Sequence, residues 1–325
     1  MTAPAWMNAA EQVRQQVVAE AEGAAQPHPP EGEPTGQPRL RLTRFADLYR
    51  NRKPVVWRVK NMLPETGVAF LYGPSGECKT FVVVDLAAHI ALGLPFRDAA
   101  TKAGSVAILA GEGNEGLVRR VSAWVQAHQT TVDIDMHISE SGGSIDTPEG
   151  LTEVFAALDA LPVPPGVVFI DTQSRWQVGD ESSTRDGAAF IRALDAIRDR
   201  YACLVVVVAH TPVADPERMR GSSTFRGAAD AQFLVRKTLS KGKNVVTMTC
   251  KKSKDVEEAP ALAWELKQIT LNGFETEDGE AVTSCWLSPT EAAADTHAGR
   301  PAKDIPYEIA VTVVKEYPGA LSAPG

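Results

Sequence analysis

Short apolar runs alternate along the chain with segments whose apolar residues recur at helical spacing. The apolar runs, rich in Val, Ile and Leu, span residues 68–72, 105–110, 167–171 and 203–210. The segments with helical spacing span residues 79–92, 114–128, 148–161 and 184–200, and a further short strand is expected near 136–139. Buried parallel strands are continuous apolar runs, because helices cover both faces of such a sheet. The pattern therefore predicts βαβ units around a mostly parallel sheet.

After residue 230 the rhythm changes. Longer segments of strand-like composition follow one another with short turns, at residues 231–238, 244–252 and 261–271. Successive strands joined by short turns are typical of antiparallel pairing. The expected fold class is therefore α/β, with a mostly parallel central sheet and an antiparallel β extension at its C-terminal edge.

Composition sets the expected domain boundaries. Residues 1–38 are rich in Pro, Gly, Ala and Gln, which cannot bury much apolar surface, so we expect a flexible N-terminal arm there. Residues 39–272 carry the alternating pattern and are expected to form one domain. From residue 273 the pattern weakens, with no Lys or Arg between Lys267 and Arg300, and a loosely structured tail is expected over 273–325.

Charge and cysteine content narrow the classes of function. The 325 residues carry a net charge of −8, whereas a protein that coats DNA over its whole surface is usually basic. No apolar run approaches the ~18 residues of a membrane span, and the first residues lack the pattern of a secretion signal. The four cysteines stand far apart, without metal-ligand spacing. We expect a cytoplasmic protein without structural zinc, in which any contact with nucleic acid is local.

A phosphate-binding loop is predicted between the first long strand and the helix that follows it. Residues 73–80 read GPSGECKT, against the pattern G-x-x-x-x-G-K-[ST]. Cys78 replaces the second glycine; we expect it to begin the helix with an ordinary negative φ, and the helix N-terminus beside Lys79 to favour its thiolate. Lys79 would neutralise the β- and γ-phosphates of ATP, and Thr80 would bind Mg²⁺. The alternative is a surface turn. The predicted cofactor-binding residues are Gly73, Pro74, Ser75, Gly76, Glu77, Cys78, Lys79 and Thr80.

Polar residues at the ends of three other strands support the nucleotide site. Asp171 ends one strand and can hold Mg²⁺, and its alternative role is to cap a helix. Glu112 follows a second strand and can orient the attacking water, although it is otherwise a loop charge or cap. His210 ends a third strand and can sense the γ-phosphate, while a lone histidine is more often structural. Carboxyl ends of parallel strands meet at one edge, where ligands bind.

These motifs resemble the RecA-like AAA ATPases of phages and plasmids, a group similar to the RepA-type hexameric plasmid helicases. The likeness covers about residues 50–270 and rests on the segments GPSGECKT, AGEGNEGLVRRV, IDTQSR, AHT and RGSSTFRGAADAQF. It implies a RecA-like core, ATP hydrolysis with Mg²⁺, a homo-hexameric ring and translocation on DNA in replication. It gives Lys79 and Thr80 the phosphate-loop roles, Glu112 the catalytic carboxylate role, and Asp171 the magnesium role. His210 takes the strand-end histidine role.

The resemblance also implies a cation that a neighbouring subunit inserts at the γ-phosphate. The position of the RepA-type arginine falls near Asp230 here, so Arg226 is the first candidate. DnaB-type rings use a basic pair after a late strand, which corresponds to Lys252 and Lys254. Lysine lacks the planar fork of arginine, so these two are partners at most.

Two loops at strand ends contain candidate residues for single-stranded DNA. Arg175 and Trp176 follow Asp171, and Arg218 and Arg220 follow His210. A cation beside a stacking ring suits a single strand, and packing between subunits is the alternative. Residues 236–254 contain seven Lys or Arg and no acidic residue, which fits either a phosphate track or a solvated hairpin.

Two classes of function fit these features best. The first is an ATP-hydrolysing ring motor on single-stranded DNA, expected as a phage or plasmid replicative helicase. The second is a DNA-binding or loading protein that uses ATP as an assembly switch and does not unwind, and a nucleotide-regulated scaffold is a third. The chain has no primase or zinc pattern, so a separate initiator or primase would be its replication partner.

Overall fold

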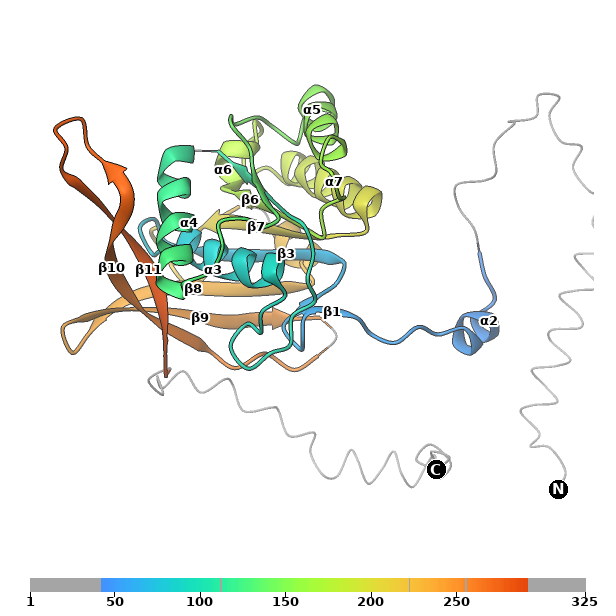
Figure 1. Cartoon of the computed structure of the whole chain (residues 1–325). Coiled ribbons are helices and arrows are strands. Elements are labelled where there is room, and N and C mark those ends of the chain that lie inside the picture. The colour runs from blue at the N-terminus through green and yellow to red at the C-terminus, as the bar shows by residue number, and fades with distance from the viewer. Residues whose placement is uncertain (1–41, 112, 222, 255, 292–325) are drawn as a thin grey trace, which may run out of the picture. The chain divides into compact units, whose positions relative to one another are not determined.

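The computed structural model describes residues 42–291 except 112, 222 and 255 (Figure 1). The described helices are α2 (Phe45–Arg50), α3 (Lys79–Leu92), α4 (Asn114–His128), α5 (Pro148–Asp159), α6 (Gln173–Trp176), α7 (Thr184–Tyr201) and α8 (Ser223–Ala228). The first strands are β1 (Trp57–Val59), β2 (Leu63–Pro64), β3 (Gly67–Gly73), β4 (Val106–Ala110), β5 (Met136–Ile138), β6 (Val167–Asp171) and β7 (Leu204–His210). The remaining strands are β8 (Ala231–Ser240), β9 (Lys243–Ser253), β10 (Leu262–Glu275) and β11 (Ala281–Thr290).

Nine of the described strands form one mixed sheet, in the order β11-β10-β9-β8-β3-β7-β6-β4-β5. Pairing is parallel from β8 through β3, β7, β6 and β4 to β5, and antiparallel from β8 through β9 and β10 to β11. This arrangement confirms the predicted α/β class with a mostly parallel core and an antiparallel extension at its C-terminal edge. Strands β3 and β6 both pair with β7 in parallel. The loop after β3 and Asp171 at the end of β6 therefore lie at the same edge of the sheet.

Alternate residues of each central strand enter two different cores. In β3, Ala69 and Leu71 pack in a cluster with α3 and α4, whereas Phe70 and Tyr72 pack in a second cluster. The second cluster also contains residues of α5, α7 and α8, including Phe225. The strands are therefore buried on both faces, which explains why their sequences are apolar without interruption.

A buried aspartate joins α3 to α4 and to the β extension. Asp85 accepts hydrogen bonds from the indole Nε1–H of Trp124, at 2.7 Å, and of Trp264, at 3.0 Å. Burial raises the pKa of Asp85, while nearby His89 lowers it. Since α3 begins at the phosphate-binding loop, this contact fixes the helix that carries Lys79 and Thr80.

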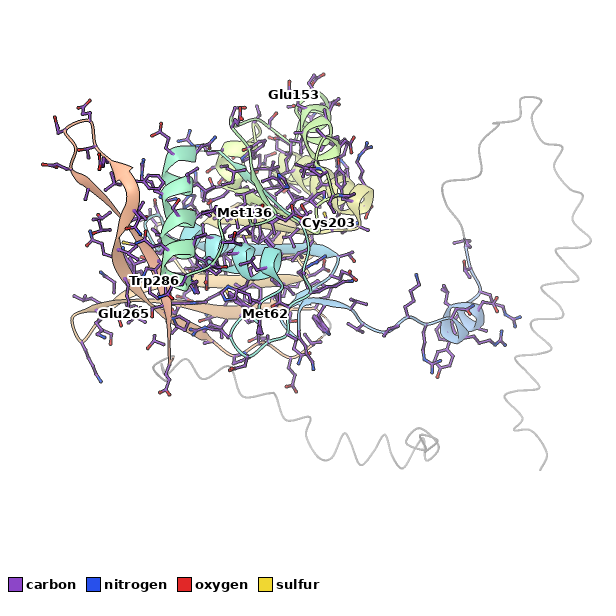
Figure 2. All side chains as sticks on the ribbon, viewed as in Figure 1. Met62, Met136, Glu153, Cys203, Glu265 and Trp286 are labelled. Atoms are coloured by element: carbon purple, nitrogen blue, oxygen red, sulfur yellow. The ribbon has the colours of Figure 1, made fainter. Side chains whose placement is uncertain are left out.

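The sheet extends further toward the C-terminus than the sequence predicted. Residues 273–275 complete β10, and residues 281–290 form β11, which pairs with β10 from Ala263↔Thr290 to Glu275↔Ala281. The predicted loose tail from residue 273 is therefore wrong for residues 273–290. Trp286 of β11, labelled in Figure 2, contacts His128 at the end of α4, so an aromatic contact holds the edge strand against the core.

The chain divides into two units, residues 1–54 and 55–325. In the first unit the structure describes only α2 and the residues beside it, and Phe45 and Leu48 of this short helix are exposed. The predicted arm at 1–38 and the tail from residue 292 lie outside the described residues. Among the helices that the structure does describe, none has the length and apolar character needed to span a membrane.

Candidate active site

The predicted phosphate-binding loop connects β3 to α3 at the carboxyl edge of the sheet. A Cβ atom on Gly73 would lie 2.3 Å from the backbone oxygen of Val235, so this position has no room for a side chain. Gly76 has φ +79°, which glycine adopts without strain. Packing therefore requires glycine at position 73, and the backbone conformation favours glycine at position 76.

Cys78 has a left-handed backbone, with φ 64° and ψ 24°, and α3 begins after it at Lys79. The expectation of an ordinary negative φ at this residue is wrong. The reason is that residue 78 is the N-terminal cap and not the first helical residue, so the chain still turns there. The glycine of the usual pattern is thus favoured by conformation as well as by space, and a cysteine here carries a strain of about 1 kcal/mol.

The side chain of Cys78 packs partly against the core cluster that contains α3, and it also lines the cavity at the loop. Burial raises the pKa of its thiol, an effect that Glu77 strengthens and that Lys237 and Arg120 oppose. The predicted preference for a thiolate is therefore wrong, because desolvation outweighs the nearby positive charges.

Lys79 is only 6% exposed and has three acceptors for its three N–H bonds. Its Nζ donates to the carbonyl oxygens of Gly73, at 2.9 Å, and Pro74, at 2.7 Å, and lies 3.3 Å from Nδ1 of His210. Burial lowers the pKa of Lys79 to about 8, although Asp171 and Glu77 act in the opposite direction. The loop thus holds the lysine in place through two of its own carbonyl oxygens.

The tautomer of His210 follows from this contact. An ammonium group has no acceptor, so Nδ1 of His210 must accept and the ring proton is on Nε2. Burial lowers the pKa of His210, and the charges of Lys79 and Arg220 lower it further. A neutral imidazole beside Lys79 presents an N–H group for an anion.

Thr80 and Asp171 form the second predicted pair. The hydroxyl of Thr80 donates to Oδ2 of Asp171 at 2.7 Å. Burial raises the pKa of Asp171, while the Thr80 hydrogen bond and the charges of Arg120 and Lys79 lower it. Burial outweighs these contacts, so the pKa of Asp171 lies above its ordinary value, and the hydroxyl donor and the two cations limit the rise.

Two adjoining cavities surround this pair. The smaller, of about 280 Å³, contains the loop and His210, and the larger, of about 610 Å³, extends along the N-terminal half of α4. They share Thr80, Arg120, Asp171 and Thr172. The cavities therefore form one depression, with the Thr80–Asp171 pair at its centre.

The residues present fit ATP and Mg²⁺. Backbone and side-chain groups of the loop line the smaller cavity with Lys79, so cationic and N–H groups face the position of a polyphosphate. The hydroxyl and carboxylate of Thr80 and Asp171 are the hard oxygen donors that Mg²⁺ prefers. Within residues 42–291, apart from the three that are not described, no cluster of three His, Cys, Asp or Glu is placed to hold a metal alone. Mg²⁺ would therefore depend on phosphate oxygens here, as it usually does.

Arg120 and Glu140 line the larger cavity and were missed by the sequence analysis. The guanidinium of Arg120 lies 5.1 Å from the centre of the Phe81 ring, and no carboxylate of the described residues forms an ion pair with it. Leu117 and Trp124, three residues before and four after it, are buried, so Arg120 stands on the inward stripe of α4. A charge on an apolar helix face was the signal available in the sequence.

Glu112 lies outside the described residues, so its predicted role stays a prediction. Its neighbours are placed: Ala110 at the end of β4 is in register with Asp171, and the N–H of Gly111 donates to the backbone oxygen of Asp171 at 2.7 Å. Gly111 therefore lies directly beside the magnesium candidate.

The three candidates for the cation supplied by a neighbouring subunit differ in their contacts. Nζ of Lys252 donates to the backbone oxygens of Arg226 and Ala229, each at 2.6 Å, and so caps the end of α8. Lys254 forms an ion pair with Asp230 at 3.2 Å. Arg226 is exposed and forms no ion pair within the part of the chain that the structure describes. Of the three, Arg226 is the one that intrachain contacts leave available.

The structure contradicts one predicted DNA contact and modifies the others. Trp176 is 3% exposed and packs in the core with α5 and α7, so it cannot stack on a base. The sequence places an aromatic residue next to Arg175, which predicted a stacking platform. The prediction failed because α6 turns Trp176 inward, and the sequence does not reveal this direction. Arg220 pairs with Glu181 at 3.2 Å, and Arg175 and Arg218 are exposed.

The basic segment 236–254 forms the hairpin of β8 and β9. Four of its cations form ion pairs with carboxylates elsewhere in the chain: Arg236, Lys243, Lys251 and Lys254. Arg236 and Lys251 share Glu217, so three carboxylates offset part of the charge of the seven cations, which favours the solvated hairpin over a phosphate track.

A family comparison agrees with this geometry. The AAA domain family matches residues 34–216, which is more than half of the chain. The chain belongs to the AAA domain family. The match confirms the relation to AAA ATPases that the motifs predicted, and it includes the phosphate-binding loop, α4 and the ends of β6 and β7.

No curated protein matches the chain. Among solved structures, the chain is similar to an ATPase domain with which it shares 15% sequence identity, at a TM-score of 0.48. The similarity extends over 86% of this chain and 98% of that domain.

Proposed function

We propose that this AAA family member is an ATP-hydrolysing ring motor that acts on single-stranded DNA, as a phage or plasmid replicative helicase would. The observation that carries the hydrolytic part is the meeting of Lys79, Thr80, Asp171 and His210 at one sheet edge, with Lys79 3.3 Å from His210 and Thr80 2.7 Å from Asp171. Two of these polar groups come from the start of α3 and one each from the ends of β6 and β7, and they converge there as transfer of a phosphoryl group requires.

In this proposal the residues bind the nucleotide by exchanging partners. Lys79 turns from the carbonyls of its own loop toward the β- and γ-phosphates, and its N–H bonds are then satisfied by anionic oxygens. Thr80 and Asp171 would hold Mg²⁺ through a hydroxyl and a carboxylate oxygen, and the ion would supply charge neutralisation at the phosphates. His210 donates its Nε2–H to a phosphate oxygen, which links the γ-phosphate to the loop after β7.

Hydrolysis in this proposal needs a base and additional positive charge. Glu112 orients the attacking water from its position after β4. Arg120, held over the Phe81 ring, supplies a cation from the same chain at the side of Asp171. Arg226 of a neighbouring subunit completes the site, with Lys252 and Lys254 holding the end of α8 that carries it.

Exchanging Glu112 for glutamine tests the chemistry. Glu112→Gln is expected to keep ATP binding and to lower turnover by ~10²-fold or more, because a positioned acid–base group is removed. Unchanged turnover would exclude Glu112 from this role.

Mixing variants tests the ring. Lys79→Ala subunits and Arg226→Ala subunits are each expected to be inactive, and a mixture is expected to regain activity, since some interfaces then hold both wild-type groups. A wild-type turnover per subunit that stays constant on dilution to monomers would contradict completion of the site by a neighbour.

The second candidate is an ATP-switched DNA-binding or loading protein without unwinding activity. The negative overall charge and the partial internal compensation of the β8–β9 hairpin favour a limited DNA contact in either case. A strand-displacement assay with ATP separates the two. Displacement supports the motor, and DNA binding with ATP hydrolysis but no displacement supports the loading protein.

A further inference from the structure

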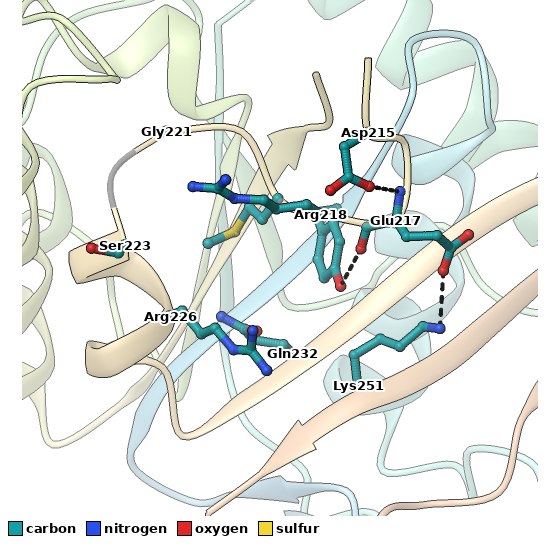
Figure 3. Close-up of a pocket in the computed structure, with 10 residues that line it drawn as sticks. Asp215, Glu217, Arg218, Gly221, Ser223, Arg226, Gln232 and Lys251 are labelled. Atoms are coloured by element: carbon teal, nitrogen blue, oxygen red, sulfur yellow. Dashed lines mark hydrogen bonds and ion pairs between the residues drawn. The ribbon is translucent and has the colours of Figure 1, made fainter. Parts of the chain in front are cut away.

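A second cavity opens at the same sheet edge but adjoins the other core. It has a volume of about 550 Å³, and its lining includes Tyr72, Arg218, Met219, Gln232 and Lys251 (Figure 3). Tyr72 and Met219 belong to the cluster with α7 and α8, not to the cluster with α3. We call this cavity the Gln232 pocket.

Gln232 is an unusual residue for a central strand. Its side chain is 4% exposed, and its Nε2 has no hydrogen-bond partner within the part of the chain that the structure describes. The β8–β9 ladder shifts register between Gln232 and Phe233, an irregularity of the kind that redirects side chains. An unpaired amide buried in this way costs free energy, so such groups are usually satisfied by a ligand or water.

The charges around the pocket are unequally compensated. Glu217 pairs with Arg236, at 2.9 Å, and with Lys251, at 3.1 Å, so its charge is matched. Asp215 accepts the backbone N–H of Glu217 at 3.3 Å. Arg218 and Arg226 are exposed and form no ion pair with any described residue. The pocket therefore offers cations at its mouth and an unpaired amide within.

We propose that the Gln232 pocket binds one nucleotide unit, with its phosphate at Arg218 and its base edge at the amide of Gln232. An amide presents a donor and an acceptor together, which is the pattern that base edges offer. A phosphate alone would satisfy the arginine but would leave much of a 550 Å³ cavity unfilled. Tyr72 and Met219 provide apolar surface for the base between the two polar ends.

Two segments connect the pocket to the candidate active site. Tyr72 directly precedes Gly73, whose carbonyl accepts a hydrogen bond from Lys79. The N–H of Arg220 donates to the backbone oxygen of His210 at 2.8 Å. This bond connects the loop that supplies Arg218 and Met219 to the end of β7, where His210 contacts Lys79. A nucleotide unit in the pocket would therefore touch both segments that position Lys79.

The unit has two possible sources, a single strand of DNA or a free nucleotide. The strand source rests on the proposed function, whereas the pocket chemistry is the same for both. Binding of a fluorescein-labelled oligothymidylate, measured by anisotropy, and of dTMP, measured by calorimetry, separates them. Binding of either probe that depends on the pocket supports the proposal.

The variants are Gln232→Leu and Arg218→Gln, with Gln268→Leu and Arg192→Gln as matched controls at exposed positions. Loss of one hydrogen bond in the pocket is expected to weaken binding roughly 5- to 10-fold for Gln232→Leu. Arg218→Gln removes a charge-assisted contact and is expected to weaken binding of the probe roughly 10-fold or more. The slope of log affinity against log salt concentration should decrease by about one. The controls should bind like the wild type. A thermal melt in the absence of probe verifies that each variant is folded.

The outcomes separate this proposal from the one above. If the wild type binds a probe and both pocket variants bind it equally well, the pocket proposal is overturned while the motor proposal stands. If the wild type binds neither probe, with or without Mg-ATP, the pocket proposal and the strand-binding part of the proposed function both fail. Continued ATP hydrolysis in that case would leave the hydrolytic part intact.

Discussion

The phosphate-binding depression and the Gln232 pocket lie at the same edge of one sheet, yet their polar groups are in opposite conditions. In the first, Lys79 has three acceptors and Thr80 donates to Asp171, so the polar groups satisfy one another. In the second, the amide of Gln232 has no partner among the described residues, and Arg218 has no ion pair there. Binding at the first must replace existing bonds, whereas binding at the second supplies missing ones.

The difference affects the affinity and the selectivity that each site should have for its ligand. A ligand that replaces internal hydrogen bonds gains only the difference in strength, which is large for an anionic phosphate and small for a neutral group. A ligand that pairs a buried amide also removes an existing penalty. The first site should therefore discriminate strongly by charge, and the second by hydrogen-bonding pattern.

The largest effect is expected for Asp171→Asn. The variant keeps the shape of the side chain but removes the charge that faces Thr80 and the magnesium position, so ATP turnover should fall by about 10²–10³-fold. Steady-state phosphate release measures this. Asp133→Asn, in an exposed loop, should leave turnover within experimental error of the wild type. Comparable losses in the two variants would contradict a specific role for Asp171 at the magnesium position.

The next effect separates two adjacent arginines on α4. Both arginines line the larger cavity, but only Arg120 also lines the smaller cavity at the phosphate-binding loop, where it lies over the Phe81 ring. Arg119 lies 3.7 Å from Glu115, away from the loop residues. Arg120→Gln is expected to lower the affinity for ATP by roughly 10- to 100-fold, as loss of a charge-assisted contact does, and to affect ADP less. Arg119→Gln serves as the control and should change either affinity by less than a few-fold. Equal effects on ATP and ADP would argue against contact with the terminal phosphate.

The pH dependence of ATP binding tests the contact between Lys79 and phosphate at the same site. The pKa of Lys79 is lowered to about 8 by burial, and a phosphate beside it favours the charged form, so binding takes up a proton above that pH. The affinity for Mg-ATP should be constant below about pH 7 and fall about tenfold from pH 7 to pH 9. Calorimetry in buffers of different ionisation enthalpy measures the proton uptake.

A variant with a permanent charge provides the control for this prediction. Lys79→Arg remains charged across the range, so its affinity, even if weaker, should not change between pH 7 and pH 9. A parallel decline in both proteins would place the titrating group elsewhere.

Much of this architecture could be predicted from the sequence. The alternation of apolar runs with helical segments gave β3, β4, β6 and β7 and the helices between them, because buried parallel strands have an unmistakable composition. The motifs also identified Lys79, Thr80, Asp171 and His210, since strand ends of a parallel sheet converge whatever the details of packing. These features depend on local sequence and on topology.

The features that were missed depend on side-chain direction, on the exact start of a helix or on partial burial. Trp176 is buried because α6 turns it toward the core, and Arg120 reaches the depression because of its place on the helix face. Cys78 is left-handed because the helix begins one residue later than expected. The edge strand β11 is only partly buried, so its sequence lacks the apolar pattern that revealed the central strands. Gln232 matched no motif, and only its burial without a partner indicates a site.

The smallest expected effect concerns the backbone of Cys78. Glycine adopts the left-handed conformation without strain, so Cys78→Gly should stabilise the fold by about 1 kcal/mol and raise the melting temperature by roughly 2–4 °C. Cys78→Ala removes the thiol but keeps the strain, so it should not produce this gain. If alanine stabilised as much as glycine, burial of the thiol and not the backbone would be the cause.

Calorimetric titration of Mg-ATP into the wild type and Cys78→Gly tests the central claim most directly. The account holds that the depression around Lys79, Thr80 and Asp171 is a working nucleotide site and that the side chain of Cys78 is accommodated partly against the core. Both proteins should therefore bind Mg-ATP, with affinities within a few-fold of each other. Binding by the glycine variant alone would mean that Cys78 obstructs the phosphates, and binding by neither would contradict the assignment of the site.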